Sequence, residues 1–140
     1  MTKSRLYLIL AGLVTIFIFS ASSQTAEESS ELSQGLLYYL MLFFGKTGIT
    51  ISHLFIRKAA HYTEFFMQSL FLSLSAVYSK KGIKPYTPGI AMVGLITACL
   101  DEFSQNFSLG RSAQMSDILL DFAGTLSALI LILIIKKRRA

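Results

Sequence analysis

Carboxylate, amide, imidazole and guanidinium side chains recur at helical spacing in and beside three otherwise apolar stretches of this chain. This polar cluster consists of Arg57, His61, Glu64, Asp101, Glu102, Gln105, Arg111, Asp117 and Asp121. Side chains three or four residues apart share one face of an α-helix, so each stretch is predicted to carry a polar stripe. Gln68 extends the first stripe, in which the side chains fall within an arc of about 60°. These residue types could perform acid–base chemistry, hold an anion or coordinate a metal ion.

His61 is the centre of any acid–base chemistry. With Glu64 or Asp101 as its partner it could act as a general acid and base, because an imidazole beside a partly buried carboxylate can titrate near neutral pH. No sequence motif names a reaction. A metal ion is an alternative, in which Asp117 would join these three residues in a set suited to zinc or manganese. One histidine without a cysteine makes a weak ligand set, so we expect no metal and no cofactor.

Arg57 and Arg111 are suited to holding a phosphate or a carboxylate. A planar guanidinium can make two parallel hydrogen bonds to such a group. Within the protein, we expect Arg57 or Arg111 to pair with Asp117 or Asp121, since an unpaired charge facing lipid is unfavourable. The structural alternative is that such polar groups only clamp helices together, with Asp117 and Ser116 serving as a helix cap.

The charges of the chain are sorted around four apolar segments, 6–22, 59–78, 88–105 and 118–135. Threading these segments through a bilayer puts nine of the 13 basic residues on one face: Lys3, Arg5, Lys80, Lys81, Lys84, Lys136, Lys137, Arg138 and Arg139. All eight carboxylates fall on the opposite face or just inside its boundary. By the positive-inside rule both termini are predicted to be cytoplasmic, in the cell membrane, and the polar cluster lies toward the outer surface.

The four segments leave no room for a second domain. A span needs about 20 residues to cross about 30 Å of hydrocarbon, and 53% of the 140 residues are hydrophobic. We therefore expect residues 1–140 to form one all-α integral membrane domain, a bundle of four transmembrane helices. The first segment could instead be a cleaved signal peptide, but its near-span length and the even number of spans favour retention. We expect no nucleic-acid partner, because the basic residues flank apolar spans.

The loop between the first two spans is predicted to lie at the outer membrane surface. Its polar start contains serine and threonine residues suited to cap a short helix that begins near Ser29 or Ser30. Residues 36–44 are apolar but too few to cross a bilayer, and the apolar run 49–56 follows after two glycines. Such runs lie along the interface or dip into it against protein. We expect an interfacial or re-entrant helical segment that forms a shelf over the outer ends of the spans.

Three blocks of the sequence resemble the signatures of the VanZ-like membrane proteins. They are Arg57-Lys58-x-x-His61-x-x-Glu64-Phe65, Asp101-Glu102-x-x-Gln105-x-Phe107-x-x-Gly110-Arg111 and Ser116-Asp117-x-x-x-Asp121-x-x-Gly124. Residues 20–24 are also similar to a Ser- and Gln-bearing stretch of that family. The resemblance covers nearly the whole chain, in order. It implies a four-span fold with the signature residues on the outer side, and a link to resistance against lipoglycopeptide antibiotics such as teicoplanin.

Two classes of function remain open on this basis. In the first, the polar cluster lines an outward-facing pocket that binds an envelope component: a lipid-linked precursor, a lipid headgroup or a lipoglycopeptide. The apolar shelf would then take a lipid chain. In the second, the protein is a small intramembrane enzyme that modifies an envelope lipid or glycan, with His61, Glu64 and Asp101 as catalytic residues. We favour binding over catalysis and over a purely structural clamp.

Overall fold

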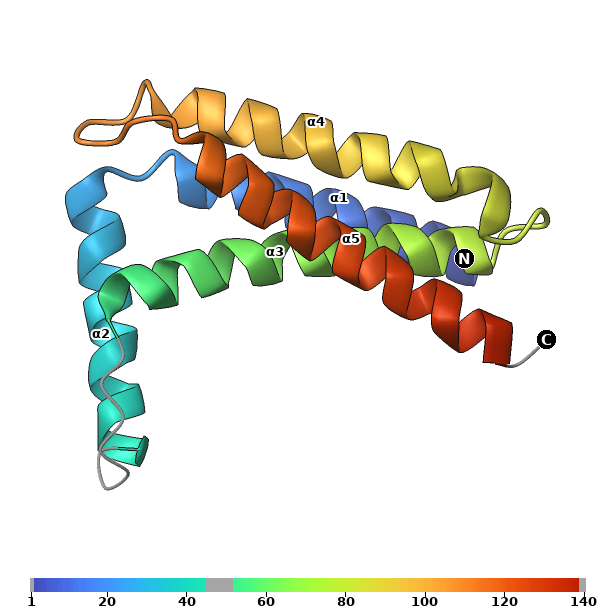
Figure 1. The fold of residues 1–140 in the computed structure, drawn as a ribbon, viewed down its shortest axis with the longest axis horizontal. Coiled ribbons are helices and arrows are strands. Elements are labelled where there is room, and N and C mark those ends of the chain that lie inside the picture. The colour runs from blue at the N-terminus through green and yellow to red at the C-terminus, as the bar shows by residue number, and fades with distance from the viewer. Residues whose placement is uncertain (1, 45–51, 139–140) are drawn as a thin grey trace.

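The computed structural model describes residues 2–44 and 52–138, and within these ranges its regular structure is entirely helical. The elements are α1 (Lys3–Ser22), α2 (Ala26–Phe44), α3 (His53–Val77), the short 3-10 helix η2 (Lys84–Tyr86), α4 (Thr87–Gln105) and α5 (Met115–Arg138). Helices α1, α3, α4 and α5 run alongside one another, and α2 leaves one end of this bundle crosswise (Figure 1). The all-α prediction is therefore confirmed for the described residues.

The four bundle helices correspond to the four apolar segments of the sequence, with extra turns at several ends. The largest difference is in α3, which begins at His53 rather than at residue 59. Ser52 caps it, because its side chain accepts a hydrogen bond from the backbone N–H of Phe55 at 3.1 Å. Residues 52–56 of the predicted shelf thus belong to the start of α3, and residues 49–51 lie outside the described part.

Helix α2 begins earlier than its sequence suggests. The cap was expected near Ser29 or Ser30, but the helix starts at Ala26. The Thr25 hydroxyl accepts from the backbone N–H of Glu28 at 3.2 Å, and the Glu28 carboxylate accepts from the backbone N–H of Thr25 at 2.8 Å. This reciprocal capping box satisfies two backbone donors and sets the first turn of the helix.

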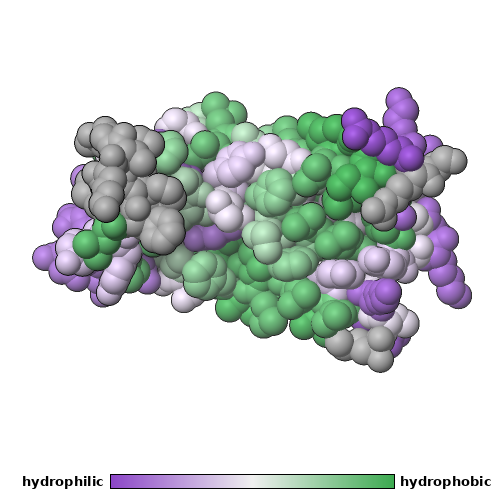
Figure 2. Space-filling view, turned by 90° about the horizontal axis from the view of Figure 1, so that it is seen from below, coloured by the Kyte–Doolittle hydropathy of each residue, from purple (hydrophilic) through white to green (hydrophobic). Residues whose placement is uncertain are grey.

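The bundle has a polar interior and an apolar exterior. Gln68, Asp101, Glu102 and Asp121 are among its largest fully buried side chains. Leucine, isoleucine and phenylalanine side chains are instead exposed along the outer faces of the helices. In Figure 2 the middle of the face shown is largely apolar, and hydrophilic residues gather toward its ends. This distribution is the reverse of that in a water-soluble protein, and it suits surroundings of lipid.

Helices α1 and α5 are long and apolar enough to span a membrane, judged by length and composition. Only 11% of the apolar window in α1 and 33% of that in α5 is buried, whereas the core helix of a soluble protein would be mostly buried. Helices α3 and α4 do not meet the same criterion. They carry five of the ionisable residues of the polar cluster, Arg57, His61 and Glu64 on α3 and Asp101 and Glu102 on α4, and such residues lower the hydropathy of a helix even where they face the interior.

Close contacts between helix backbones depend on glycine. A Cβ atom at Gly124 would lie 2.5 Å from the carbonyl oxygen of Tyr62, so α5 and α3 touch where no larger residue fits. A Cβ atom at Gly94 would collide with the side chain of Thr125, so the absence of a side chain at Gly94 lets Thr125 of α5 pack against the backbone of α4. Both glycines are buried.

Polar side chains also form hydrogen bonds between helices in the interior of the bundle, away from the polar cluster. The Gln68 amide donates to the hydroxyl of Thr15 on α1 at 2.8 Å and to that of Thr97 on α4 at 3.3 Å. The Ser69 hydroxyl donates to the carbonyl of Thr125 on α5 at 2.8 Å. Helix α3 is therefore the central element, hydrogen-bonded to the other three helices of the bundle.

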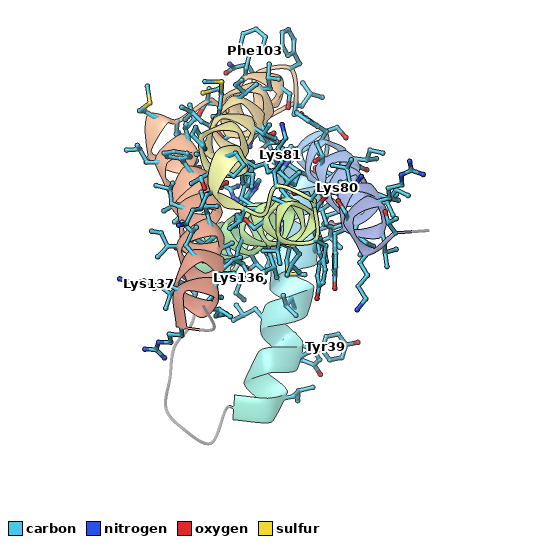
Figure 3. The ribbon with its side chains drawn as sticks, turned by 90° about the vertical axis from the view of Figure 1, so that its right-hand side faces the viewer. Tyr39, Lys80, Lys81, Phe103, Lys136 and Lys137 are labelled. Carbon is cyan, nitrogen blue, oxygen red and sulfur yellow. The ribbon has the colours of Figure 1, made fainter. Side chains whose placement is uncertain are left out.

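Both ends of the chain lie at the same end of the bundle, together with the turn between α3 and α4 (Figure 1). Lys80, Lys81, Lys136 and Lys137 gather at this end (Figure 3). The structure thus groups the basic residues as the sequence predicts. That this end faces the cytoplasm stays a prediction.

Candidate functional site

The opposite end of the bundle is closed by a junction between two loops. The carbonyl of Ser22, at the end of α1, accepts from the Arg111 guanidinium at 3.3 Å. The backbone N–H of Ala26 donates to the carbonyl of Leu109 at 3.0 Å. Gly110 permits this approach, because its φ is +76° and a Cβ atom there would lie 3.0 Å from the Cβ of Ala26. The α4–α5 loop thus places Arg111 beside the α1–α2 connection.

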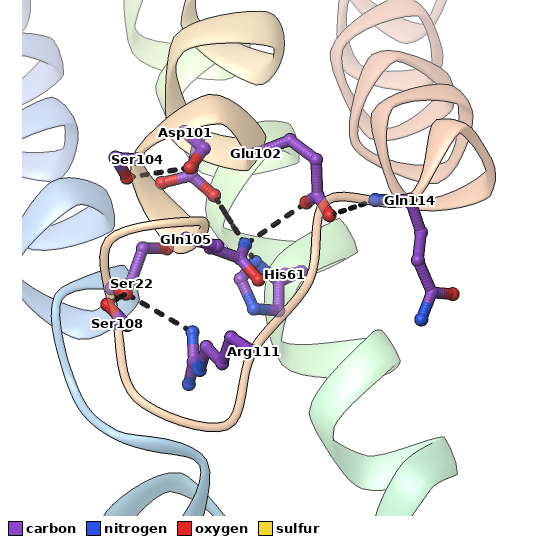
Figure 4. Close-up of polar contacts among 9 residues, drawn as sticks. All are labelled: Ser22, His61, Asp101, Glu102, Ser104, Gln105, Ser108, Arg111 and Gln114. Atoms are coloured by element: carbon purple, nitrogen blue, oxygen red, sulfur yellow. Dashed lines mark hydrogen bonds and ion pairs between the residues drawn. The ribbon is translucent and has the colours of Figure 1, made fainter.

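Gln105 and the acidic residues of α4 form a hydrogen-bonded network beneath this junction (Figure 4). The Gln105 amide donates to the carboxylate of Asp101 at 3.3 Å and to that of Glu102 at 3.1 Å. The other Glu102 oxygen accepts from the backbone N–H of Gln114 at 2.6 Å. Both carboxylates are buried. Glu102 therefore also ties α4 to the segment that leads into α5.

His61 brings α3 into the same cluster. Its Nδ1 atom lies 3.9 Å from an oxygen of Asp101, so the predicted pairing of His61 with one of its two candidate carboxylates is present. Asp121 approaches from α5, and one ligand atom from each of these three residues lies within 4.8 Å of the other two. Both oxygens of Asp121 and the second oxygen of Asp101 have no hydrogen-bond partner among the described residues.

The predicted pairing of Asp117 with an arginine is wrong. Its carboxylate accepts from the ammonium of Lys58 at 2.6 Å and from the hydroxyl of Ser116 at 3.1 Å. Lys58 was not among the expected partners of Asp117. One residue turns a helix by 100°, so the choice between Arg57 and Lys58 depends on the rotation of α3 against α5, which a single stripe does not determine. Asp121 likewise forms no ion pair with a described arginine.

A cavity of about 270 Å³ opens above these groups. It is lined by Phe17, Ser20, Ala21, Gln24, Ser29, Leu32, Ser33, Arg57, Ala60, His61, Glu64 and Arg111. Burial first and then the charge of Arg57 lower the pKa of Arg111. The Nε atom of Arg111 is buried without a hydrogen-bond partner among the described residues. The guanidiniums of Arg57 and Arg111 therefore place two positive charges in one cavity, and the Nε donor of Arg111 is free to bind an anion.

An apolar groove of about 430 Å³ adjoins this cavity. Leu36 of α2 and Phe55 and Ile56 of α3 line it, and Ala60 and Glu64 line both spaces. The predicted shelf, residues 36–56, is therefore represented in the described residues by the facing sides of α2 and α3. A ligand with a charged head and an apolar chain could occupy both spaces at once.

The members of the polar cluster differ in which cavity they line. Four line the large cavity, namely Arg57, His61, Glu64 and Arg111. A second cavity, of about 10 Å³, is lined by Arg57, Lys58, His61, Gln105, Asp117, Leu120 and Asp121. Asp101 and Glu102 line neither of these two cavities and lie among the buried contacts of α4.

Sequence reasoning did not place three polar residues of this cavity wall, Ser20, Ser29 and Ser33, in a binding site. The serine-rich composition of residues 20–33 was the available signal, and it was interpreted as a polar loop with a helix cap. Ser29 and Ser33 are buried because α2 starts at Ala26 and turns that face toward α3. Their role depends on the crosswise placement of α2.

The two candidate membrane helices and the apolar exterior indicate a membrane protein. The model of the VanZ/LLP1 family matches residues 7–136. The chain belongs to the VanZ/LLP1 family, as the three signature blocks predict. No curated protein and no solved structure matches the chain.

Proposed function

We propose that this VanZ/LLP1 protein is a four-span protein of the cell membrane that binds an anionic envelope component in an outward-facing pocket. Helices α1, α3, α4 and α5 would cross the bilayer, with both termini in the cytoplasm. The ligand would be a lipid-linked cell-wall precursor, a lipid headgroup or a lipoglycopeptide. The pocket is the 270 Å³ cavity, and the adjoining groove takes the apolar chain.

The membrane crossing of α3 and α4 is supported by the direction of their side chains. The ionisable residues Asp101 and Glu102 are buried, and Met92, Ile96 and Leu100 on the other side of α4 are exposed. Charged groups inside a membrane turn toward the protein interior, because facing lipid would cost about 2.5–3.5 kcal/mol on insertion scales. Retention of α1 is supported by its hydrogen bonds to α3 and to the α4–α5 loop.

The observation that carries the binding proposal is the pair of arginines in one cavity. Arg57 and Arg111 both line it, and neither is neutralised by a carboxylate within 4.0 Å among the described residues. A phosphate or carboxylate would relieve their mutual repulsion and accept from the free Nε donor of Arg111. The continuity with the apolar groove through Ala60 and Glu64 favours a lipid-linked anion over a free one.

Family membership also suggests a link to antibiotic resistance. A lipoglycopeptide of the teicoplanin type carries an acyl tail, which the apolar groove could take. Resistance would then follow if the pocket competes for the drug or for the precursor that the drug binds.

Catalysis is the second candidate, and it is favoured by one specific contact. His61 lines the ligand cavity and lies 3.9 Å from Asp101, so it could move a proton to or from a bound ligand with the carboxylate orienting the imidazole. Glu64 lines the same cavity and could supply a second acid–base group. In this case the bound envelope molecule would be chemically changed.

The test is ligand binding by purified protein, measured by native mass spectrometry. The probes are a polyprenyl diphosphate-linked precursor, phosphatidylglycerol and teicoplanin. Because a hydrogen bond to a charged group contributes about 1.5–3 kcal/mol, Arg57→Gln and Arg111→Gln should each weaken binding about 10- to 100-fold. Arg111→Lys should also weaken it, since an ammonium lacks the planar two-point contact. Arg5→Gln removes an arginine at the other end of the bundle and serves as the control.

Glu64→Gln and Asp101→Asn should each abolish the resistance or growth phenotype that the protein gives to cells, while membrane insertion persists. Expression has to be measured alongside, because removing one partner from a semi-buried polar group can destabilise the fold. Unchanged binding of every probe by both arginine variants would contradict the pocket proposal. A mass change in the bound probe that disappears in Glu64→Gln would establish catalysis.

A further inference from the structure

The interior of the polar cluster contains more negative charge than its described partners neutralise. Lys58 pairs with Asp117 and balances it. The other charged members are Glu64, Asp101, Glu102, Asp121, Arg57 and Arg111. Even when both guanidiniums are counted against the four carboxylates, two negative charges remain if all are ionised, which is the charge that one divalent cation neutralises.

Asp121 is the residue whose surroundings point to such a ligand. Its side chain is 1% exposed, and neither carboxylate oxygen has a hydrogen-bond partner among the described residues. Buried polar groups are almost always paired, so an orphaned carboxylate calls for a partner. Asp101 is 0% exposed and has one oxygen in the same condition. Three unpartnered carboxylate oxygens, one from Asp101 of α4 and two from Asp121 of α5, therefore converge in the interior.

The distances fit a shared ion. One ligand atom from each of His61, Asp101 and Asp121 lies within 4.8 Å of the others. Imidazole nitrogen and carboxylate oxygen bind zinc at about 2.0–2.2 Å, so two ligand atoms of one tetrahedral ion lie about 3.3–3.6 Å apart. The His61–Asp101 distance of 3.9 Å is close to this range. The Asp121 ligand atom, which lies within 4.8 Å of the other two, would need to move by no more than about 1.5 Å.

There is also space of the right size. His61 and Asp121 both line the cavity of about 10 Å³, which is the volume open to a single water-sized sphere. His61 lines the larger ligand cavity as well. An ion beside His61 would therefore be close to the proposed anion site without occupying it.

We propose that His61, Asp101 and Asp121 bind one divalent transition-metal ion of the zinc or manganese class. One imidazole nitrogen and two carboxylate oxygens suit these metals better than calcium, which prefers six or more oxygens. Three protein ligands leave a coordination position for water or for an oxygen of a ligand in the cavity. The sequence did not favour a metal, because one histidine without a cysteine makes a weak ligand set, and the set that it offered contained Glu64 and Asp117 rather than Asp121. Asp117 is neutralised by Lys58 instead.

The fold brings Asp121, which was absent from the ligand set expected from the sequence, next to His61. Asp121 reaches His61 because Gly124, one turn further along α5, lets the two helix backbones touch. The network around Asp101 fits the same role, since the Gln105 amide donates to Oδ2, the oxygen 3.9 Å from His61, and Oδ1 has no partner among the described residues. A hydrogen bond of this kind orients a carboxylate ligand for a metal.

The test is metal content. Full-length protein is purified in detergent, stripped with a chelator, dialysed against Zn²⁺ or Mn²⁺ and analysed by inductively coupled plasma mass spectrometry. We expect about one ion per chain, as for a three-residue site. His61→Gln and Asp121→Asn should each weaken binding by at least about 100-fold, because loss of an outer-shell partner alone costs 10- to 100-fold. Glu27→Gln removes an exposed carboxylate from the first turn of α2 and should retain the ion.

A readout without substitutions guards against variants that fail to fold. The stripped wild-type protein should unfold at a higher temperature when the ion is added, since a ligand of the native state stabilises it. Retention of the ion by Asp121→Asn, or uptake of no ion by the wild type, would overturn the proposal and leave protons as the neutralising partner. Metal content is measured without any envelope ligand, so it can fail while anion binding succeeds, and the reverse.

Discussion

The contact between α3 and α5 at Gly124 supports a quantitative prediction. A Cβ atom in Gly124→Ala would lie 2.5 Å from the carbonyl oxygen of Tyr62 and 3.3 Å from the backbone nitrogen of Phe66. Ordinary van der Waals contact begins at 3.4 Å, so the helices must part locally by about 0.9 Å. The obstacle is backbone, which cannot turn aside as a flexible side chain can.

We expect Gly124→Ala to lower the free energy of unfolding by about 1–3 kcal/mol, the usual cost of an overpacked core. Alanine is the better helix former by about 0.5–1 kcal/mol, so the steric cost must exceed that gain. The matched control is Gly12→Ala in α1, where nothing lies within 4 Å of the added methyl group. That substitution should be neutral or stabilising. The same chemical change is therefore expected to lower the free energy of unfolding at Gly124 and to leave it unchanged or raise it at Gly12.

The measurement is unfolding by sodium dodecyl sulfate in mixed micelles, followed by circular dichroism, with both variants and the wild type side by side. The site should respond too, because Asp121 stands three residues before Gly124, about 4.5 Å along α5. Separating the helices there moves Asp121 away from His61 and should reduce metal uptake. If Gly124→Ala is as stable as Gly12→Ala, the helices do not touch as described and the argument for convergence at Asp121 loses its support.

Three further predictions concern the rest of the chain. Lys58→Ala should lower stability by less than about 1 kcal/mol in the same unfolding assay, since the Lys58 side chain is 44% exposed and its pair with Asp117 is partly screened. In a cysteine-free background, Lys81→Cys should resist an impermeant thiol reagent in intact cells, whereas a cysteine on the exposed face of α2 should react; the reverse pattern would invert the topology. Hydrogen bonds from Thr25 lower the pKa of Glu28 below its usual 4.5. The capping of α2 should therefore be complete above pH 4.5 and be lost as the pH falls through the lowered pKa. Protection of the first amides of α2 from hydrogen exchange, relative to their intrinsic rate at each pH, measures this, and protection that stays constant over that range would contradict it.

Much of the helical framework could be read from the sequence, because the bilayer sets the length of a span and the 3.6-residue period sets its polar face. The four predicted segments lie within bundle helices, except that 59–78 ends on Tyr78, the residue after α3. Gly94, Thr97, Asp101 and Gln105 are all buried on α4 as their spacing predicts. Grouping of the basic residues at one end followed from the same segments. These features depend on single helices, for which local spacing is sufficient.

The start of α2 was missed although its signal was present. Thr25 and Glu28 have the spacing of a capping box, but a serine-rich segment offers several competing caps. The crosswise direction of α2 cannot be read from spacing at all. It depends on the hydrogen bond from Ala26 to Leu109, a residue far away in the chain. That contact decides which serines enter the cavity wall.

The sequence by itself determined which residues form the polar cluster and on which helical faces they lie. Only the tertiary structure decided which of them meet. Lys58 rather than an arginine takes Asp117, and Asp121 rather than Asp117 joins His61 and Asp101. The physical reason is that partners are chosen by the rotation and depth of one helix against another. Those quantities are set where backbones touch, as at Gly124 and Tyr62, and the period of a single helix carries no information about them.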